Sequence, residues 1–283
     1  MLILLSYLYY FIASSANSLH IRYLTKKRDL ASMDQIRFTF ETFLILSLGS
    51  LLFPFFSPFY ISGNYLHLIL LFLVSGVLGM GCSALFTIAQ KHLDAGVTSL
   101  VSNIYTPVTI VLSSFFLHEG LTPLQIAGTF LLLIAVVIVS KKHRIGRFSF
   151  DKYFLYMVLS GILLGVLLVA ERALQNMTGF SAGTMLSWGA QTLFLGLLTL
   201  FTKSRHTYTN KEVIGYGFVR FLSATSWVVL VYAVGNLSLV SSITTFKIVV
   251  VFIAAALFLH EREDLGRKIL GSVIALVGLL LMK

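Results

Sequence analysis

Long apolar stretches, separated by short polar connections, run through the chain from end to end. A helix that crosses about 30 Å of hydrocarbon needs about 20 mostly apolar residues. Stretches of that kind cover residues 2–24, 34–54, 65–89, 93–117, 123–140, 153–174, 180–201, 212–234, 238–259 and 266–282. The connections are too short for a soluble domain, so neighbouring spans form antiparallel hairpins. The pattern predicts an all-α integral membrane fold of ten transmembrane helices.

The first apolar stretch is predicted to be a retained span and not a signal peptide. No positive charge precedes it, and no small-x-small cleavage site follows it. Its centre is also polar, because it carries Ser14, Ser15, Asn17 and Ser18.

The composition agrees with a surface that faces lipid. Hydrophobic residues make up 57% of the 283 positions and charged residues only 11%, with a mean hydropathy of +0.91, whereas a soluble domain carries about 25% charged residues. The net charge of +10 does not indicate nucleic acid, because the basic residues lie in short clusters between apolar stretches. The single cysteine, Cys82, excludes an internal disulfide and a cysteine-based metal site.

Lysine and arginine are distributed unequally between the two sides of the predicted bundle. All but four of the 21 lie in or beside the connections that follow odd-numbered spans. The exceptions are Arg172 and Lys283 on the opposite side, and Arg220 and Lys247 within spans. Because positive residues stay on the cytoplasmic side, the odd connections are predicted to be cytoplasmic. We therefore expect a multi-pass protein of the cell inner (plasma) membrane with both termini non-cytoplasmic.

A four-residue sequence recurs at half the chain length. Residues 116–119, Phe-Leu-His-Glu, reappear as residues 258–261, and each copy ends an apolar stretch. The chain therefore divides into two halves of five spans, residues 1–140 and 153–283, joined by a basic connection, 141–152. Because five is odd, the second half is predicted to be inverted relative to the first. Repeats of this kind place a substrate site near the midplane between them.

With these two endings the chain resembles the EamA-like branch of the drug/metabolite transporter superfamily over its whole length. Members end the fourth span of each half with Phe-Leu-x-Glu, usually with glycine before the glutamate, where this chain has His118 and His260. Pro107, twelve residues before Glu119, has no counterpart in the second half, since Val249 stands there. The resemblance implies a secondary carrier that works by alternating access, with a central cavity lined by spans 1, 3, 4, 6, 8 and 9.

Lys247 is the strongest candidate for a functional side chain. It lies in the middle of the ninth span, too deep for its ammonium group to reach water by snorkelling. We interpret it as a cationic contact for an anionic substrate group or, alternatively, as the titrating group of a proton-coupled carrier. A structural ion pair with Glu41 or Glu171 is the third interpretation. The offset of 142 pairs Lys247 with Tyr105, so the two are expected to meet across a pseudo-twofold axis.

Other polar side chains at membrane depth form two groups. Further candidates for substrate contact are Asn17, His20, Asn103, Trp188, Gln191, Arg220 and Trp227. For Trp188, Gln191 and Trp227 the alternative is simple packing or anchoring, and Arg220 is close enough to the basic side to snorkel. Candidates for ion pairing or coupling are Arg37 with Glu41, four residues apart on one helical face, and the adjacent Glu171 and Arg172. We expect the first pair to be local and the second to lie at the membrane interface.

The remaining motifs limit the function. No nucleotide-binding motif is present, so the sequence excludes ATP-driven pumping within this chain and implies no cofactor. His118 and His260 lie on opposite faces in this topology and cannot share a metal. A membrane enzyme would need clustered catalytic groups, but the 11 acidic residues are scattered, and a scaffold would not need polar residues in the middle of spans. We therefore predict a secondary transporter of a small polar or anionic metabolite, as a monomer or homodimer in the bilayer.

Reporter tags test the predicted orientation. A tag between residues 141 and 147 should report the cytoplasm, and tags at both termini should report the opposite side, because the basic connections stay inside. Termini found in the cytoplasm would overturn the orientation derived from charge and would leave the ten spans intact.

Overall fold

The computed structural model describes residues 2–27, 32–55, 57, 59–116, 122–140, 151–202, 208–234, 237–244, 247–258 and 265–281, and all regular secondary structure in them is helical. Six segments of this described part are long and apolar enough to cross a membrane: Ser32–Phe55, Tyr65–His92, Ala95–Phe116, Lys152–Thr178, Phe180–Phe201 and Asn210–Val234. The all-helical fold is therefore confirmed with six candidate spans. The number of ten crossings stays a prediction.

The helices overlap all ten of the predicted apolar ranges. Those of the first half are α1 (Leu2–Lys27), α2 (Ser32–Ser50), the short 3-10 helix η1 (Phe53–Phe55), α3 (Tyr65–Gln90), α4 (Ala95–Ser102), α5 (Tyr105–Phe116) and α6 (Pro123–Ser140). Those of the second half are α7 (Lys152–Thr178), α8 (Phe180–Leu200), α9 (Asn210–Val234), α10 (Leu237–Thr244), α11 (Lys247–Phe258) and α12 (Leu265–Leu281). The repeated endings, including His118, Glu119, His260 and Glu261, and most of the connection 141–152 lie outside the described residues.

The fourth predicted span is not one helix, because it is interrupted between α4 and α5. Pro107 has no N–H, so the carbonyl of Asn103 cannot accept the usual bond from four residues later. Instead that carbonyl accepts from the N–H of Thr106 at 2.9 Å, and the N–H of Asn103 donates to the Leu100 carbonyl at 3.2 Å. The chain thus makes a tight turn in which these backbone groups are paired, and α5 starts at Tyr105.

Two glycines of α7 let it pack directly against this turn. A Cβ atom at Gly161 would lie 2.9 Å from the carbonyl oxygen of Ser102, and one at Gly165 would lie 2.9 Å from that of Tyr105. Both distances are shorter than a normal carbon–oxygen contact, so any larger residue would push the helices apart. The turn between α4 and α5 is therefore held against the second half of the chain.

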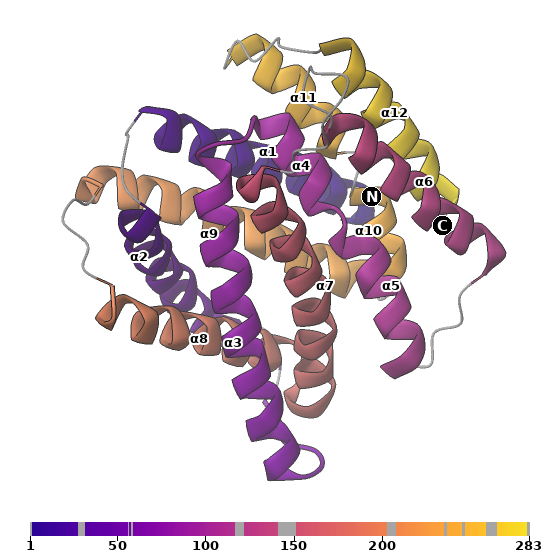
Figure 1. The fold of residues 1–283 in the computed structure, drawn as a ribbon. Coiled ribbons are helices and arrows are strands. Elements are labelled where there is room, and N and C mark those ends of the chain that lie inside the picture. The colour runs from indigo at the N-terminus through magenta and orange to yellow at the C-terminus, as the bar shows by residue number, and fades with distance from the viewer. Residues whose placement is uncertain are drawn as a thin grey trace.

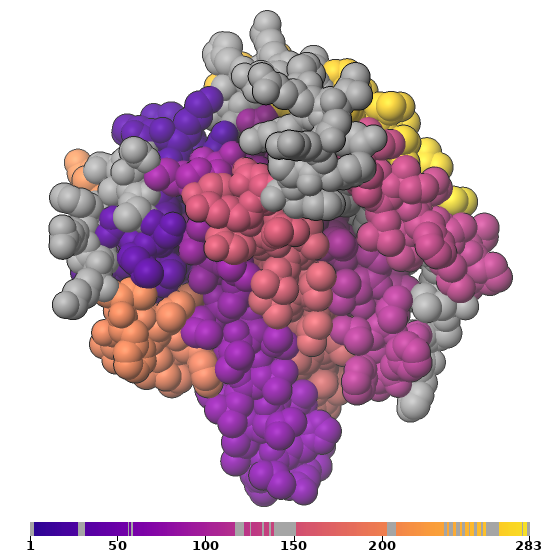
Figure 2. Space-filling view, viewed as in Figure 1, coloured from indigo at the N-terminus to yellow at the C-terminus, as the bar shows by residue number. Residues whose placement is uncertain are grey.

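The packing of the helices is exchanged between the two halves (Figure 1). Helix α1 packs on α9, and the corresponding pair is α7 on α3. Helix α2 also packs on α9, and the corresponding pair is α8 on α3. The last helices of the two halves, α6 and α12, pack on each other. When α1, α2 and α3 are matched with α7, α8 and α9, each of these contacts has a counterpart. Figure 2 shows α3 and α7 side by side along the face that it draws. This exchange is what a two-fold relation between the halves produces, while the inversion itself and the domain boundaries stay predictions.

Substitution of the two glycines tests the close contact. Gly161→Ala and Gly165→Ala should each lower the free energy of unfolding by about 1–3 kcal/mol, the usual cost of overpacking. The melting temperature of the purified protein in detergent measures the change. Gly189→Ala on α8 is the control, because a Cβ there meets nothing within 4 Å, and it should leave the melting temperature unchanged or raise it. An equal loss at all three positions would argue against a specific contact.

Candidate functional site

A cavity of about 280 Å³ lies between helices of both halves. This volume is close to the lower end of the range for small-molecule pockets, which is about 300–1,000 Å³. Helices α1, α3, α4, α5, α7, α9 and α11 line it, and these belong to the six spans expected to do so. Helices α2 and α8 contribute as well, through Phe43 and Leu46 and through Trp188 and Gln191. The cavity is thus large enough for a small metabolite.

The structure brings most of the candidate residues together at this cavity. Those that line it are Asn17, Tyr105, Glu171, Trp188, Gln191, Arg220, Trp227 and Lys247. Those that do not are His20, Arg37, Glu41, Asn103 and Arg172.

Lys247 lies at the cavity wall, half-buried, at the first residue of α11. Within the described residues its ammonium group forms no ion pair with either of the two acids considered for it. Glu41 is paired with Arg37 of its own helix, at 3.1 Å, and Glu171 accepts a hydrogen bond from Ser187. Among the described residues Lys247 therefore lies at the cavity without an ion pair to either acid.

Tyr105 lies at the same cavity as Lys247, as the offset of 142 led us to expect. Its ring packs edge-on against Trp227, with the ring centroids 6.4 Å apart. Trp227 in turn contacts Tyr10 at 5.7 Å. These three rings come from α5, α9 and α1 and form an aromatic wall beside the lysine.

Arg220 is held within the cavity wall by an aromatic ring. Its guanidinium carbon lies 4.0 Å from the centroid of the Phe43 ring, a cation–π arrangement. Its Nη1 atom donates to Thr42 Oγ1 at 3.4 Å. Within the described residues no carboxylate pairs with it, so the cavity holds a second cation besides Lys247.

Glu171, which we expected to form an interfacial pair with Arg172, lies buried at the cavity instead. It is 7% exposed and lines the cavity, because α7 continues to Thr178 and places it about two turns inside the helix. Ser187 Oγ donates to its Oε2 atom at 3.0 Å, and Gln191 Nε2 donates to that hydroxyl oxygen at 3.1 Å. The adjacent Arg172 points elsewhere and donates to Gln175 Oε1 at 3.4 Å.

The other candidates outside the cavity have local partners. The ring of His20 packs edge-on against Tyr216, with the ring centroids 5.6 Å apart. Tyr10, Ser14 and Asn17 form a row along one face of α1, and the next residue in that row is 21. His20 therefore lies beside the row that faces the cavity. Asn103 Nδ2 donates to the Ser99 carbonyl at 2.6 Å, at the end of α4. Arg37 and Glu41 form their pair on the more exposed side of α2.

Several small polar residues of the wall were not among the candidates, namely Ser83, Ser223 and Cys82. Ser223 lies three residues after Arg220 and four before Trp227, so helical spacing could have placed it on their face. Ser83 and Cys82 belong to a strongly apolar helix, and no comparable signal marks them.

Residues 4–141 match the family model described as the EamA-like transporter family. This half of the chain belongs to the EamA-like transporter family. The family is part of the drug/metabolite transporter superfamily, so the resemblance inferred from the sequence is confirmed. Members of the EamA family are transporters and not enzymes. Together with the apolar helices, this membership indicates a multi-pass membrane protein that transports small molecules.

Comparison with solved structures shows a likeness of fold over both halves of the chain. One structure, described only as the crystal structure of a protein, matches with a TM-score of 0.65 and 14% sequence identity, over 98% of this chain and 94% of that one. At this identity the match shows the fold alone. No curated protein matches the sequence.

Replacing single lysines tests whether Lys247 stabilises the fold. Lys247→Met should leave the melting temperature unchanged or raise it, because an ammonium group without a counter-ion at membrane depth costs free energy. Lys268→Met is the comparison, since Lys268 is buried and paired with Asp94. It should lower the stability by about 1–3 kcal/mol, the range for a lost charged hydrogen bond. A larger loss in Lys247→Met than in Lys268→Met would identify Lys247 as a structural residue.

Proposed function

We propose that this EamA-like chain is a secondary transporter that moves a small polar or anionic metabolite across the membrane by alternating access. The substrate binds in the cavity between the two halves, and the connections rich in lysine and arginine face the cytoplasm. The family of residues 4–141 and the fold shared over both halves support the transport class. The chemistry of the cavity supports the substrate class.

The observation that carries the proposal is the cation of Lys247 at the cavity wall. A charge at membrane depth is costly and persists where it has a partner or a water-filled cavity. Within the described residues Lys247 has no carboxylate partner, so an anionic group of the substrate is the natural counter-ion. Two unit charges 4 Å apart attract by about 4 kcal/mol at an effective dielectric constant of 20, enough to hold a small anion reversibly.

Two further features favour an anionic group at this place. Arg220 adds a second positive charge to the wall, whereas the single carboxylate there, Glu171, already accepts a hydrogen bond. Helix α5 also starts at Tyr105, after the interruption of the span, so the positive end of its dipole lies at the cavity. Interrupted helices whose N-terminal ends face the substrate are a recurring device of secondary transporters.

The rest of the wall selects for size and for an organic body. The aromatic rings of Tyr10, Trp188 and Trp227 and the hydroxyl residues Ser14 and Ser99 all line the cavity. Such a surface offers stacking area together with hydrogen-bond partners. It suits a small organic molecule that carries one anionic group, rather than a bare inorganic ion.

A transport assay tests the proposal. A thermal-shift screen of metabolites on the purified protein first identifies ligands, because a ligand that binds the native state raises its melting temperature. Protein in liposomes should then exchange the labelled ligand. Lys247→Ala should abolish both exchange and the thermal shift while the melting temperature without ligand stays near wild type. Lys247→Arg should keep the charge and transport poorly, because the guanidinium has a different shape.

Lys211→Ala is the matched control, because Lys211 is exposed at the start of α9, away from the cavity. It should transport like wild type. Transport that survives in Lys247→Ala would refute the role of the lysine. Unfolding of Lys247→Ala that a second change at Glu171 reverses would show a structural pair instead.

A further inference from the structure

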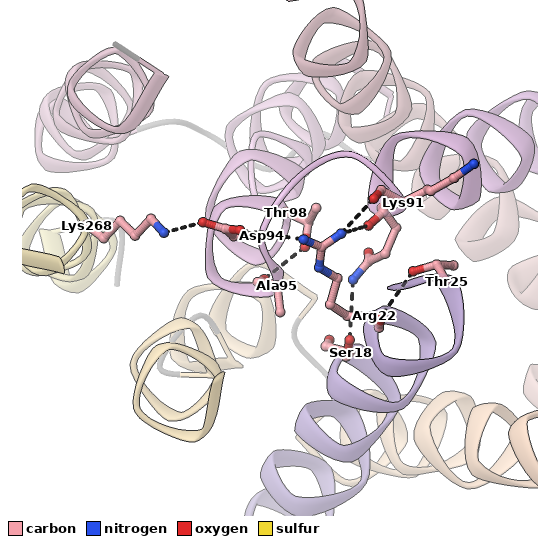
Figure 3. Close-up of polar contacts among 9 residues, drawn as sticks. Ser18, Arg22, Thr25, Lys91, Asp94, Ala95, Thr98 and Lys268 are labelled. Carbon is pink, nitrogen blue, oxygen red and sulfur yellow. Dashed lines mark hydrogen bonds and ion pairs between the residues drawn. The ribbon is translucent and has the colours of Figure 1, made fainter. Parts of the chain in front are cut away.

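A buried cluster of charged side chains closes the bundle at its basic end (Figure 3). Arg22 Nη1 donates to the carbonyls of Gln90 and Lys91, at 2.9 and 2.8 Å. Arg22 Nη2 lies 3.6 Å from Asp94 Oδ1, and Lys268 reaches the other oxygen of the same carboxylate. Arg22 and Lys268 are 7% and 6% exposed. One carboxylate thus holds two buried cations that approach it from opposite sides.

This cluster connects elements that border the cavity. Arg22 lies on α1, one turn after Ser18, which lines the cavity and whose carbonyl accepts from Gln90 Nε2 at 3.3 Å. Asp94 precedes α4, which places Ser99 and Ser102 on the cavity wall. Lys268 belongs to α12 of the second half. Separation of the cluster would therefore free α1 from the α3–α4 connection directly beside the cavity.

The opposite end of the bundle holds an equivalent arginine that is not engaged in this way. Helices α1 and α7 are the first of their halves, with 26 and 27 residues, and an offset of 150 places Arg172 at the position of Arg22. Within the described residues Arg172 contacts no carboxylate and bonds only Gln175 Oε1. Arg172 lines a small pocket, about the size of a water molecule. This pocket lies beside the cavity, because Glu171 and Trp227 line both.

We propose that the Arg22–Asp94–Lys268 cluster is the gate of the basic side, closed in this conformation and opened during transport. The inference rests on the proposed transport function, and it names the residues that close the cavity on one side of the membrane. Arg22 holds α1 to the end of α3 through hydrogen bonds to two carbonyl groups. Its equivalent Arg172 bonds only a residue of its own helix among the described residues. The residue before α10 in the sequence is Asn236, where α4 is preceded by Asp94. Among the described residues only the basic side has such a cluster, so this conformation is the one closed at the basic side.

Accessibility of the cavity tests the gate without any substrate. The reporter is Ser102→Cys in a Cys82→Ser background, which leaves one thiol on the cavity wall. A small charged methanethiosulfonate reagent that does not cross the membrane is applied to each face of oriented vesicles. With the gate intact, labelling from the basic face should be slow. Arg22→Gln should speed it at least about tenfold, because each charge-assisted hydrogen bond that is lost is worth a factor of that order.

Two further variants make the result decisive. Asp94→Asn removes the ion pairs and leaves the arginine–carbonyl bonds, so it should give a smaller increase from the same face with a folded protein. Arg172→Gln is the matched control and should leave labelling from the basic face unchanged. If Arg22→Gln and Asp94→Asn both label like the parent, or if Arg172→Gln has the same effect as they do, the gate is refuted. Failure of the liposomes to exchange solute would refute the transport function, whatever the labelling shows.

Discussion

Hydrocarbon offers no partner for a backbone N–H or carbonyl, so any irregular backbone at membrane depth must be satisfied by the protein itself. The turn between α4 and α5 meets this condition for its backbone, because the N–H of Thr106 donates to the carbonyl of Asn103 and the N–H of Asn103 donates to the carbonyl of Leu100. Gly161 and Gly165 then let α7 cover it at backbone distance. Only with this cover can α5 start in the middle of a span and present Tyr105 to the cavity. The wall of the cavity therefore depends on a backbone interruption that the opposite half of the chain covers.

The same condition separates two kinds of buried charge. Arg22 and Lys268 are fully engaged with carbonyl groups and a carboxylate, so their burial contributes to one particular packing of the helices. Lys247 and Arg220 instead face a cavity, and the partners of the arginine are the Phe43 ring and the hydroxyl group of Thr42. Engaged charges hold a conformation, whereas charges at a cavity wall attract a ligand. A transporter needs both, since it must close around its substrate and then release it.

The sequence predicted the positions of the helices well, because lipid requires long apolar stretches, but it did not predict that the fourth span is divided into α4 and α5. It also placed Lys247 and Tyr105 at a shared site, since the repeat offset relates them. Glu171 was misplaced because α7 runs four residues beyond its apolar stretch, to Thr178. His20 was predicted to line the cavity with Asn17, but its side chain points about 60° away from that of Asn17 around the axis of α1. The cluster of Arg22, Asp94 and Lys268 could not be predicted, because these residues meet only through tertiary packing.

The position of the tryptophans at the cavity has a spectroscopic consequence. The chain contains two tryptophans, Trp188 and Trp227, and both line the cavity. The indole fluorescence of the protein therefore originates entirely from the cavity wall, with Trp188 beside Phe53 and Trp227 beside Tyr10 and Tyr105. Entry of a solute or of water changes the polarity around both indoles at once. The unlabelled protein thus carries its own optical probe of the cavity, because no other tryptophan contributes to the indole emission.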